Sequence, residues 1–276
     1  MKKIETLRQL QLVDIFIYKE ILKVCNEHGL KLYLLGGTLI GAVRHGGFIP
    51  WDDDIDLCMS RPDYNKLLDI TGGVIGDKCT IIDPERNKDY KGIVPIVAYN
   101  NSAVLSKQFK EDEHLKVNIS IFVYDGAPKS KLGRFYYYTK LYILRAEHAA
   151  CRADFKHVNT KAARLVGPIL TPIFKGADVY KYKNKILKWQ QKYTYEDSEF
   201  VSTNMDSYSQ REVFPKYTFE DSTDLTFEGI KSSTFSNYHE QLTRYYGDYM
   251  KLPPVEEQRG KHSFDAEIED SFVFEE

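Results

Sequence analysis

The densest concentration of chemically capable side chains in this sequence falls within the segment Gly36–Leu57. Four aspartates crowd into five consecutive positions near its end, and such a cluster repels itself unless cations or hydrogen bonds offset the charge. Ile55 and Leu57 alternate there with Asp54 and Asp56, which predicts a strand with one buried face and two carboxylates on the other. Because hard carboxylate oxygens suit Mg2+ or Mn2+, the spacing favours a divalent metal site over a solvated acidic loop.

A glycine-rich turn precedes the aspartates. Leu30–Leu35 is predicted to form a short buried strand, and Gly36-Gly37-Thr38 follows it, with Thr38 predicted to cap a helix that runs to about Arg44. Glycines between a strand and a helix N-terminus expose backbone amides to an anion such as phosphate, although Gly37 is also explained by close helix packing. Such a turn followed by Asp-x-Asp on the next strand is the layout of the nucleotidyltransferase fold.

The block Arg44–Asp56, which reads RHGGFIPWDDDID, resembles the LicD family. That family includes bacterial phosphocholine transferases and is related to the animal fukutins, which transfer ribitol phosphate. Further segments carry the same resemblance: Asp63-Tyr64, Ile119–Phe122, Asp125–Pro128, Phe227–Gly229, Tyr246–Pro254 and His262. The resemblance implies transfer of a phosphoryl-alcohol unit from a cytidine diphosphate (CDP) carrier to a sugar hydroxyl of a teichoic acid, lipopolysaccharide or capsule precursor.

Ser120 is the position where this sequence departs from the family pattern. The later strand of the family usually reads hydrophobic-Asp-hydrophobic-Phe, and that Asp is the third carboxylate of the site. A serine hydroxyl is a poor metal ligand and a poor general base at neutral pH. Three explanations stay open: Asp52 or Asp53 completes the metal shell, Asp125 reaches in from the strand end, or the site is weakened and in the extreme inactive.

The resemblance implies a division of roles among the candidate site residues. The proposed assignments are Asp54, Asp56 and Asp53 for the metal, with one of these carboxylates as the base for the acceptor hydroxyl; Gly36, Gly37 and Thr38 for phosphate oxygens; Arg44 and His45 for charge on the leaving nucleotide; and Trp51, Asp125 and His262 for other substrate contacts.

Four of these residues also have simpler explanations. Arg44 is explained equally by an ion pair with one of the neighbouring aspartates, and His45 by a hydrogen bond within its own loop. Trp51 suits stacking on a cytosine or a choline-like head group, but such a residue more often packs beneath its loop. His262 can approach the site from the C-terminal segment or lie exposed in a tail.

Hydrophobic periodicity predicts an α/β protein with a mixed sheet. Residues 1–130 are predicted to form a nucleotidyltransferase-like core, residues 131–264 a helical and mixed extension that packs back on it, and residues 265–276 a flexible acidic tail. The predicted helices cover residues 4–27, 38–44, 62–70, 132–191 with breaks near its prolines, and 238–246. The predicted strands cover residues 30–35, 55–59, 79–82, 93–99, 103–105 and 117–124.

The charge balance narrows the classes of partner. The net charge of −2 argues against a strongly basic duplex-binding protein, so no nucleic-acid partner is expected. The charge is uneven, however: residues 140–192 hold 12 basic and three acidic side chains. Together with the apolar run Ala162–Phe174, flanked by Lys156, Lys161 and Lys175, this suggests peripheral contact with the inner face of an anionic membrane. A core helix broken by prolines explains the same run.

No apolar stretch resembles a signal peptide or a membrane span, and four scattered cysteines show no metal spacing, so a cytoplasmic protein is expected. Two other classes of function compete with the phosphotransferase. Clustered carboxylates also serve glycoside hydrolases, which need no glycine turn and would work in chelator. A relative whose site has decayed at Ser120 would bind nucleotides or glycans without turnover.

Overall fold

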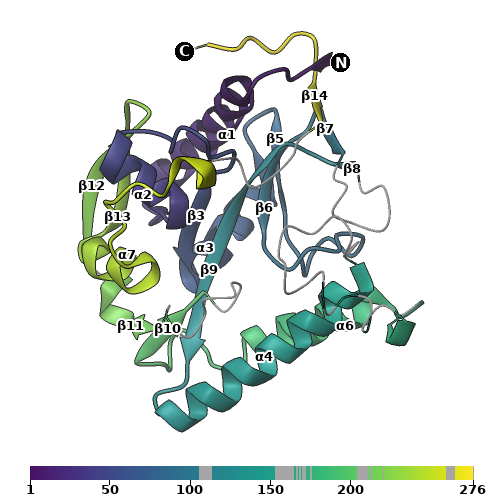
Figure 1. The fold of residues 1–276 in the computed structure, drawn as a ribbon, viewed down its shortest axis with the longest axis vertical. Coiled ribbons are helices and arrows are strands. Elements are labelled where there is room, and N and C mark those ends of the chain that lie inside the picture. Colours follow the sequence, from purple (N-terminus) through teal and green to yellow (C-terminus); the bar gives the residue numbers. More distant parts are fainter. Residues whose placement is uncertain are drawn as a thin grey trace.

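The computed structural model describes residues 1–105, 114–152, 165–203, 211–258 and 265–275, apart from positions 166, 168, 170, 171, 175, 212 and 220. A mixed sheet forms its centre, with helices around it, and confirms the predicted α/β class (Figure 1). In spatial order the strands are β12 (Ser222–Phe227), β13 (Ile230–Phe235), β2 (Tyr33–Leu34), β3 (Asp56–Ser60), β9 (Asn118–Ala127), β6 (Ile96–Tyr99), β5 (Cys79–Ile82) and β4 (Val74–Ile75).

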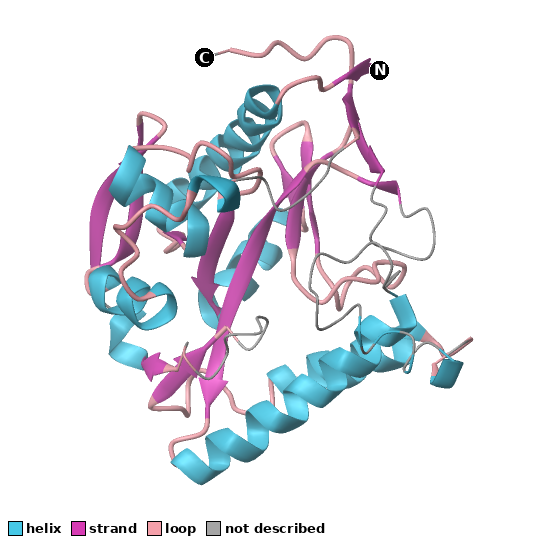
Figure 2. Ribbon diagram, in the orientation of Figure 1, coloured by secondary structure: helices cyan, strands magenta, loops and turns pink. Residues whose placement is uncertain are grey.

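Helices and smaller strands complete the described part. The helices are α1 (Leu7–Glu27), α2 (Gly36–His45), α3 (Arg61–Thr71), α4 (Lys131–Arg152), α6 (Val179–Gln190) and α7 (Tyr238–Tyr246), with short 3-10 turns at Lys216–Phe219 and Val255–Glu257 (Figure 2). β10 (Phe200–Ser202) pairs with the end of β9 and with β11 (Phe214–Pro215), and a second sheet has the order β1 (Lys2–Lys3), β14 (Ala266–Ile268), β7 (Ser102–Leu105), β8 (His114–Leu115). Among the described helices, none is long and apolar enough to cross a bilayer.

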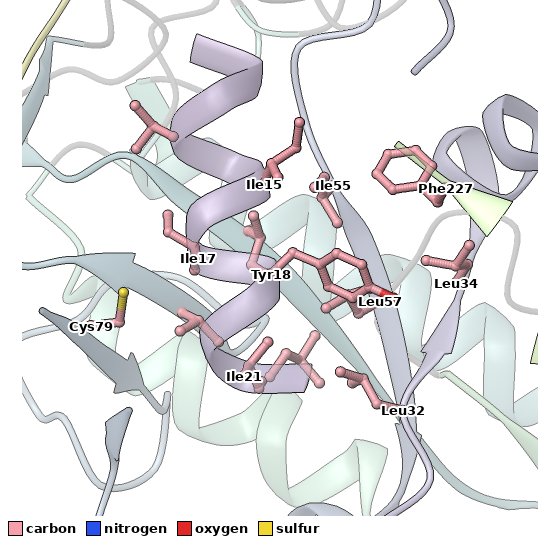
Figure 3. Packing of buried hydrophobic residues seen from close by; sticks show 14 of the residues in the cluster. Ile15, Ile17, Tyr18, Ile21, Leu32, Leu34, Ile55, Leu57, Cys79 and Phe227 are labelled. Carbon is pink, nitrogen blue, oxygen red and sulfur yellow. The ribbon is translucent and has the colours of Figure 1, made fainter. Parts of the chain in front are cut away.

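Helix α1 is the main partner of the sheet. It begins with a capping box, in which Thr6 accepts from the backbone of Gln9 and the Gln9 side chain accepts from the backbone of Thr6. Its apolar stripe, including Ile17 and Ile21, is fully buried against residues such as Leu57 (Figure 3). The position of α1 is therefore fixed by packing along its whole length.

Strands β3 and β9 lie parallel in the middle of the sheet, with Asp56 opposite Ser120. Alternation along them divides the two faces: Leu57 and Ile121 join the main core beneath α1, whereas Cys58 and Tyr124 join a second core that the C-terminal segments cover. Asp56 and Ser120 lie on this second face and are only half-buried. The two strands thus present polar side chains where their N-terminal halves meet.

The extension beyond residue 130 does more than pack on the core. α4 and α6 lie side by side and bury Tyr137, Leu141 and Ile186 between them and the sheet end. However, the β12–β13 hairpin joins the central sheet, since β13 pairs in parallel with β2. The division of the chain at residue 130 stays a prediction.

The C-terminal tail differs from the expectation. Residues 265–275 were predicted to be flexible, but β14 inserts between β1 and β7. Phe272 is buried and makes edge-to-face contacts with Phe16 and Tyr99. Glu269 accepts hydrogen bonds from Lys78 and Tyr99, which ties the acidic residues to the sheet. The prediction was wrong because the acidic composition concealed two apolar anchors, Ile268 and Phe272.

Truncating Phe272 tests the contribution of this tail. We expect Phe272→Ala to lower the free energy of unfolding by about 3 kcal/mol, because it leaves a cavity beside Phe16 and Tyr99. The matched control is Val273→Ala at an exposed neighbouring position, which should change stability by less than about 0.5 kcal/mol. If urea denaturation gave the same loss of unfolding free energy for both variants, this would contradict the packing of the tail.

Candidate active site

The site is built around the first turn of α2. This helix begins at Gly36 directly after Leu35, so Thr38 lies inside the helix and does not cap it. The Thr38 side chain is buried, and its hydroxyl accepts the backbone N–H of Asp56 at 2.8 Å. The observed role of this hydroxyl is to join α2 to the start of β3, rather than to face a substrate.

Carboxylates lie near both glycines of the turn, and Gly37 is needed for the close approach of one of them. A Cβ atom on Gly37 would lie 2.7 Å from Oδ2 of Asp52, which is shorter than a real contact. A Cβ atom on Gly36 would lie 3.5 Å both from Oδ2 of Asp56 and from the hydroxyl of Tyr246. Since the first N–H groups of a helix have no partner within it, this turn is a favourable environment for negative charge.

Three consecutive carboxylates form a compact group beside this turn. One oxygen from each of Asp52, Asp53 and Asp54 lies within 4.8 Å of the others, and Asp53 is buried. The predicted alternation is confirmed, because Ile55 and Leu57 are fully buried while Asp54 and Asp56 are not. Asp54 nevertheless lies in the loop before β3, and Asp56 is outside the group of three. An all-oxygen donor set of this kind fits a hard divalent cation.

A fourth carboxylate lies beneath this group and was missed from the sequence. Asp14 on α1 is 1% exposed, and neither of its oxygens has a hydrogen-bond partner within the described ranges. Burial raises the pKa of the Asp14 carboxyl well above its ordinary value, and the charges of Asp54 and Asp53 raise it further. A buried, unpartnered carboxyl next to three others is a further observation that fits a bound cation. A buried acidic residue in an otherwise apolar helix stripe is the signal that reveals it.

Polar side chains hold the aspartate loop in place. The Gln11 side chain donates to the carbonyl of Asp52 at 2.8 Å, one turn before Asp14 on the same helix. Glu228, at the tip of the β12–β13 hairpin, accepts from the backbone of Phe48 at 3.0 Å and from Arg8 at 3.0 Å. Glu228 has a positive φ of 51°, which is unusual for a residue with a side chain. The loop is therefore fixed by α1 on one side and by a distant hairpin on the other.

Ser120 occupies the position expected for the third carboxylate. It is the register partner of Asp56 in the parallel pair β3–β9, so the two side chains project from the same face. Asp125 does not replace it, because Asp125 lies five residues further along β9, about 16 Å away. Asp125 is buried and accepts two 2.8 Å hydrogen bonds from Arg61. The expectation that Asp125 reaches the site is therefore wrong.

Arg44 and His45 lie at the other end of α2 from Gly36, a separation of about 13 Å along the helix axis. Arg44 donates from Nε to Nε2 of His45 and from Nη1 to the carbonyl of Tyr249, both at 2.9 Å. Burial, together with the charge of Arg44, lowers the pKa of His45. His45 is thus hydrogen-bonded to its neighbour within the last turn of α2 rather than to the loop that follows. Arg44 is joined to the C-terminal segment by its hydrogen bond to Tyr249.

The other residues that the sequence singled out for this site have different outcomes. Trp51 is half-buried and packs against the main core, in agreement with the simpler explanation. His262 lies outside the described residues. Tyr246, by contrast, was quoted from the sequence without a role, and the end of α7 brings its hydroxyl to Gly36, which Asp56 also approaches. Only the tertiary fold places a residue 190 positions from Asp56 in this site.

Comparisons with known proteins identify the family of this chain. Residues 29–162 match the family described as LicD/FKTN/FKRP, nucleotidyltransferase domain. The chain is 30% identical over 273 residues to the lipopolysaccharide cholinephosphotransferase LicD of Haemophilus influenzae, covering 97% of this chain and 100% of that protein. It is also 30% identical over 99 residues to the ribitol 5-phosphate transferase FKRP of Mus musculus and of Homo sapiens, covering 36% of this chain and 18% of those proteins.

The fold and the carboxylate site thus define a nucleotidyltransferase-like domain. The chain belongs to the LicD family, as the match over nearly its whole length shows. It is a phosphotransferase homologue, and its relatives are named for transfer of choline phosphate to lipopolysaccharide and of ribitol 5-phosphate.

Replacing Asp14 by Asn tests how much the buried carboxylate of Asp14 destabilises the folded protein. Because the pKa of Asp14 is raised in the folded state, ionising it lowers stability as pH rises above the unfolded pKa of about 4. We therefore expect metal-free Asp14→Asn to be more stable than the wild type at pH 7, by about 1–3 kcal/mol, and equal to it near pH 3.

The stabilities would be compared by thermal unfolding in chelator across this pH range. Asp77→Asn, at an exposed turn, is the matched control and should show no such gain. If Asp14→Asn were less stable than the wild type at pH 7, this would contradict the conclusion that the Asp14 carboxylate has no partner and is repelled by its neighbours. Adding Mg2+ should reduce the advantage of the variant, since a bound cation favours the ionised carboxylate.

Proposed function

We propose that this protein is a Mg2+- or Mn2+-dependent phosphotransferase that moves a phosphoryl-alcohol group from a CDP-linked donor to a sugar hydroxyl of a cell-surface glycan precursor. The observation that carries this proposal is the compact group Asp52–Asp54 against the glycine turn of α2, next to Asp56. Membership of the LicD family supports the reaction class. The relative that the chain matches over its full length is named for cholinephosphate transfer, so phosphocholine is our first choice of transferred group.

In this proposal the metal is held by Asp52, Asp53 and Asp54, with Asp56 completing the acidic surface. When bound, a divalent cation would neutralise the charge of the diphosphate and polarise its phosphoryl oxygens. The backbone N–H groups of Gly36 and Gly37, at the start of α2, would bind phosphate oxygens. The first turn of α2 and the neighbouring aspartate loop would therefore both contribute to binding of the diphosphate, the first through N–H groups and the second through the metal.

We assign proton acceptance to Asp56. The acceptor hydroxyl forms a bond to the phosphorus nearest the alcohol, the bond from that phosphorus to the nucleotide oxygen breaks, and cytidine monophosphate leaves. The hydroxyl proton passes to the Asp56 carboxylate, since the neighbouring Ser120 is too weak a base. Tyr246, whose hydroxyl lies near Gly36 as the Asp56 carboxylate does, would help to orient the donor phosphate. Arg44 and His45 would act from further away, on the leaving nucleotide.

Release of cytidine monophosphate tests the reaction. We would incubate the protein and Mg2+ with CDP-choline, CDP-ribitol and CDP-glycerol, with and without glycan acceptors. Asp54→Asn and Asp56→Asn should each lower turnover at least about a hundredfold, because each removes charge that is needed in the transition state. The matched control, Asp77→Asn, should keep wild-type turnover.

Unchanged turnover in either aspartate variant would refute the proposed site. Calorimetric binding of a CDP conjugate without any product would instead support a decayed, binding-only relative. Cleavage of a glycan in the presence of chelator would support a glycoside hydrolase.

Restoring the missing carboxylate gives an independent test of the metal site. Ser120→Asp places a third carboxylate beside Asp56 in the sheet register, so we expect Mn2+ to bind about tenfold more tightly. Ser120→Asn is the control of equal size without the charge and should bind Mn2+ as the wild type does. Titration calorimetry measures both. Equal affinity in the Asp and Asn variants would mean that residue 120 does not face the metal.

A further inference from the structure

The outer face of α4 carries several large apolar side chains although it faces solvent. The exposed side chains include Leu132, Phe135, Tyr136, Tyr142 and Ile143, with exposed fractions between 47% and 79%. Their spacing places them on one side of the helix, and the opposite side packs against α6. α4 thus carries large apolar side chains on its solvent side, beside the exposed Thr139 and Lys140, as well as on its packed side. A cluster of exposed apolar side chains of this size is typical of an interaction surface.

A row of lysines runs along the neighbouring helix. Lys181, Lys185, Lys188 and Lys192 recur every three or four residues from the start of α6 to just beyond its end, and all four are exposed. α6 contains no acidic residue to neutralise them. Lys183, on the other side, is buried and donates to the carbonyl of Tyr90 at 2.6 Å. The four outer lysines therefore form a basic stripe.

The two features meet where Tyr136 of α4 approaches the end of α6. α4 and α6 lie along each other at the base of the molecule in the view of Figure 1. Lys192 Nζ lies 5.8 Å from the centre of the Tyr136 ring, and the rings of Tyr136 and Trp189 are 6.0 Å apart. We call this surface the α4–α6 face: the five exposed apolar residues of α4 and the four outer lysines of α6.

We propose that the α4–α6 face docks on an anionic lipid bilayer. Apolar and aromatic side chains beside a lysine row suit the boundary between acyl chains and head groups, where tyrosine and tryptophan bury their rings and keep a polar end in water. Lysines attract anionic lipids, and their long stems reach past apolar neighbours to the head groups. The charge of the stripe thus selects negatively charged lipid as the occupant.

Apolar residues of the run 162–174 are also exposed where the structure describes them. Leu165, Ile169 and Ile173 are exposed by 78%, 67% and 70%. Lys156 and Lys161, which the sequence suggested as membrane contacts, lie outside the described residues. The docking surface is thus assigned to α4 and α6, of which α6 and most of α4 lie within the basic segment 140–192 that the sequence singled out.

Docking would place the carboxylate site at a set distance from the membrane. Ser120 lies near the start of β9 and Ala127 at its end, about 23 Å along the strand, and α4 follows a few residues later. If the proposed function holds, a lipid-linked acceptor would therefore present a sugar some distance from its lipid anchor. The docking itself does not depend on that function.

Vesicle flotation of the full-length protein tests the docking. We expect binding to vesicles of equal parts phosphatidylcholine and phosphatidylglycerol, weak binding to pure phosphatidylcholine, and loss of binding at high salt. Phe135→Ser with Ile143→Ser should weaken binding to the anionic vesicles at least about tenfold, and so should Lys181→Glu with Lys188→Glu. Val74→Ser and Lys66→Glu, at exposed positions on β4 and α3, are the matched controls and should bind as the wild type does.

Three results would overturn the docking proposal. The wild type could stay off anionic vesicles while folded, or both double variants could bind as tightly as the controls. A wild type that is dimeric in analytical ultracentrifugation, with monomeric variants and no vesicle binding, would make the face a protein interface instead. Mn2+ binding is measured in parallel on each variant. Because none of these substitutions touches the aspartate loop, unchanged Mn2+ affinity separates a failure of docking from a failure of the proposed function.

Discussion

The rest of the structure depends on the close approach of several carboxylates to one helix end. Asp52 lies against the first turn of α2 only because residue 37 has no side chain, and Asp56 approaches the same turn at Gly36, whose positive φ of 57° favours glycine. Asp53 and Asp54 add charge to the same place, and Asp14 adds a buried carboxyl from below. Such a cluster opposes folding unless rigid packing or a cation offsets the repulsion. The surrounding helices and strands hold this cluster of carboxylates in place.

Three separate parts of the chain support the aspartate loop. α1 supports the loop through the Gln11 side chain, and β3 is joined to α2 through Thr38. The third part is Glu228, which connects the β12–β13 hairpin both to α1 and to the loop. Because these supports begin in elements packed into the central sheet, the aspartates are placed by the core rather than by the loop itself.

The C-terminal third completes the site and closes the fold. Tyr246 brings a hydroxyl to Gly36, and Tyr249 offers its carbonyl to Arg44. The tail then returns to pair with the first strand of the chain. The α4–α6 face, by contrast, belongs to the middle of the chain and lies at the far end of β9 from Ser120. A phosphotransferase that acts on a lipid-linked glycan would need both parts: a metal site for the donor and a surface that keeps the enzyme near its acceptor.

The sequence by itself determined the α/β class, the family, and the buried alternation at Ile55 and Leu57. It also determined individual elements such as strand 79–82 and helix 238–246. All of these depend on local periodicity and on the spacing of motifs. It did not determine which distant groups meet. Only the tertiary structure placed Asp14 beneath the aspartates, bound Asp125 to Arg61 and packed Phe272 into the core. The physical reason is that these contacts depend on how helices and strands pack together, and residues far apart in the sequence leave no periodic signal of that packing.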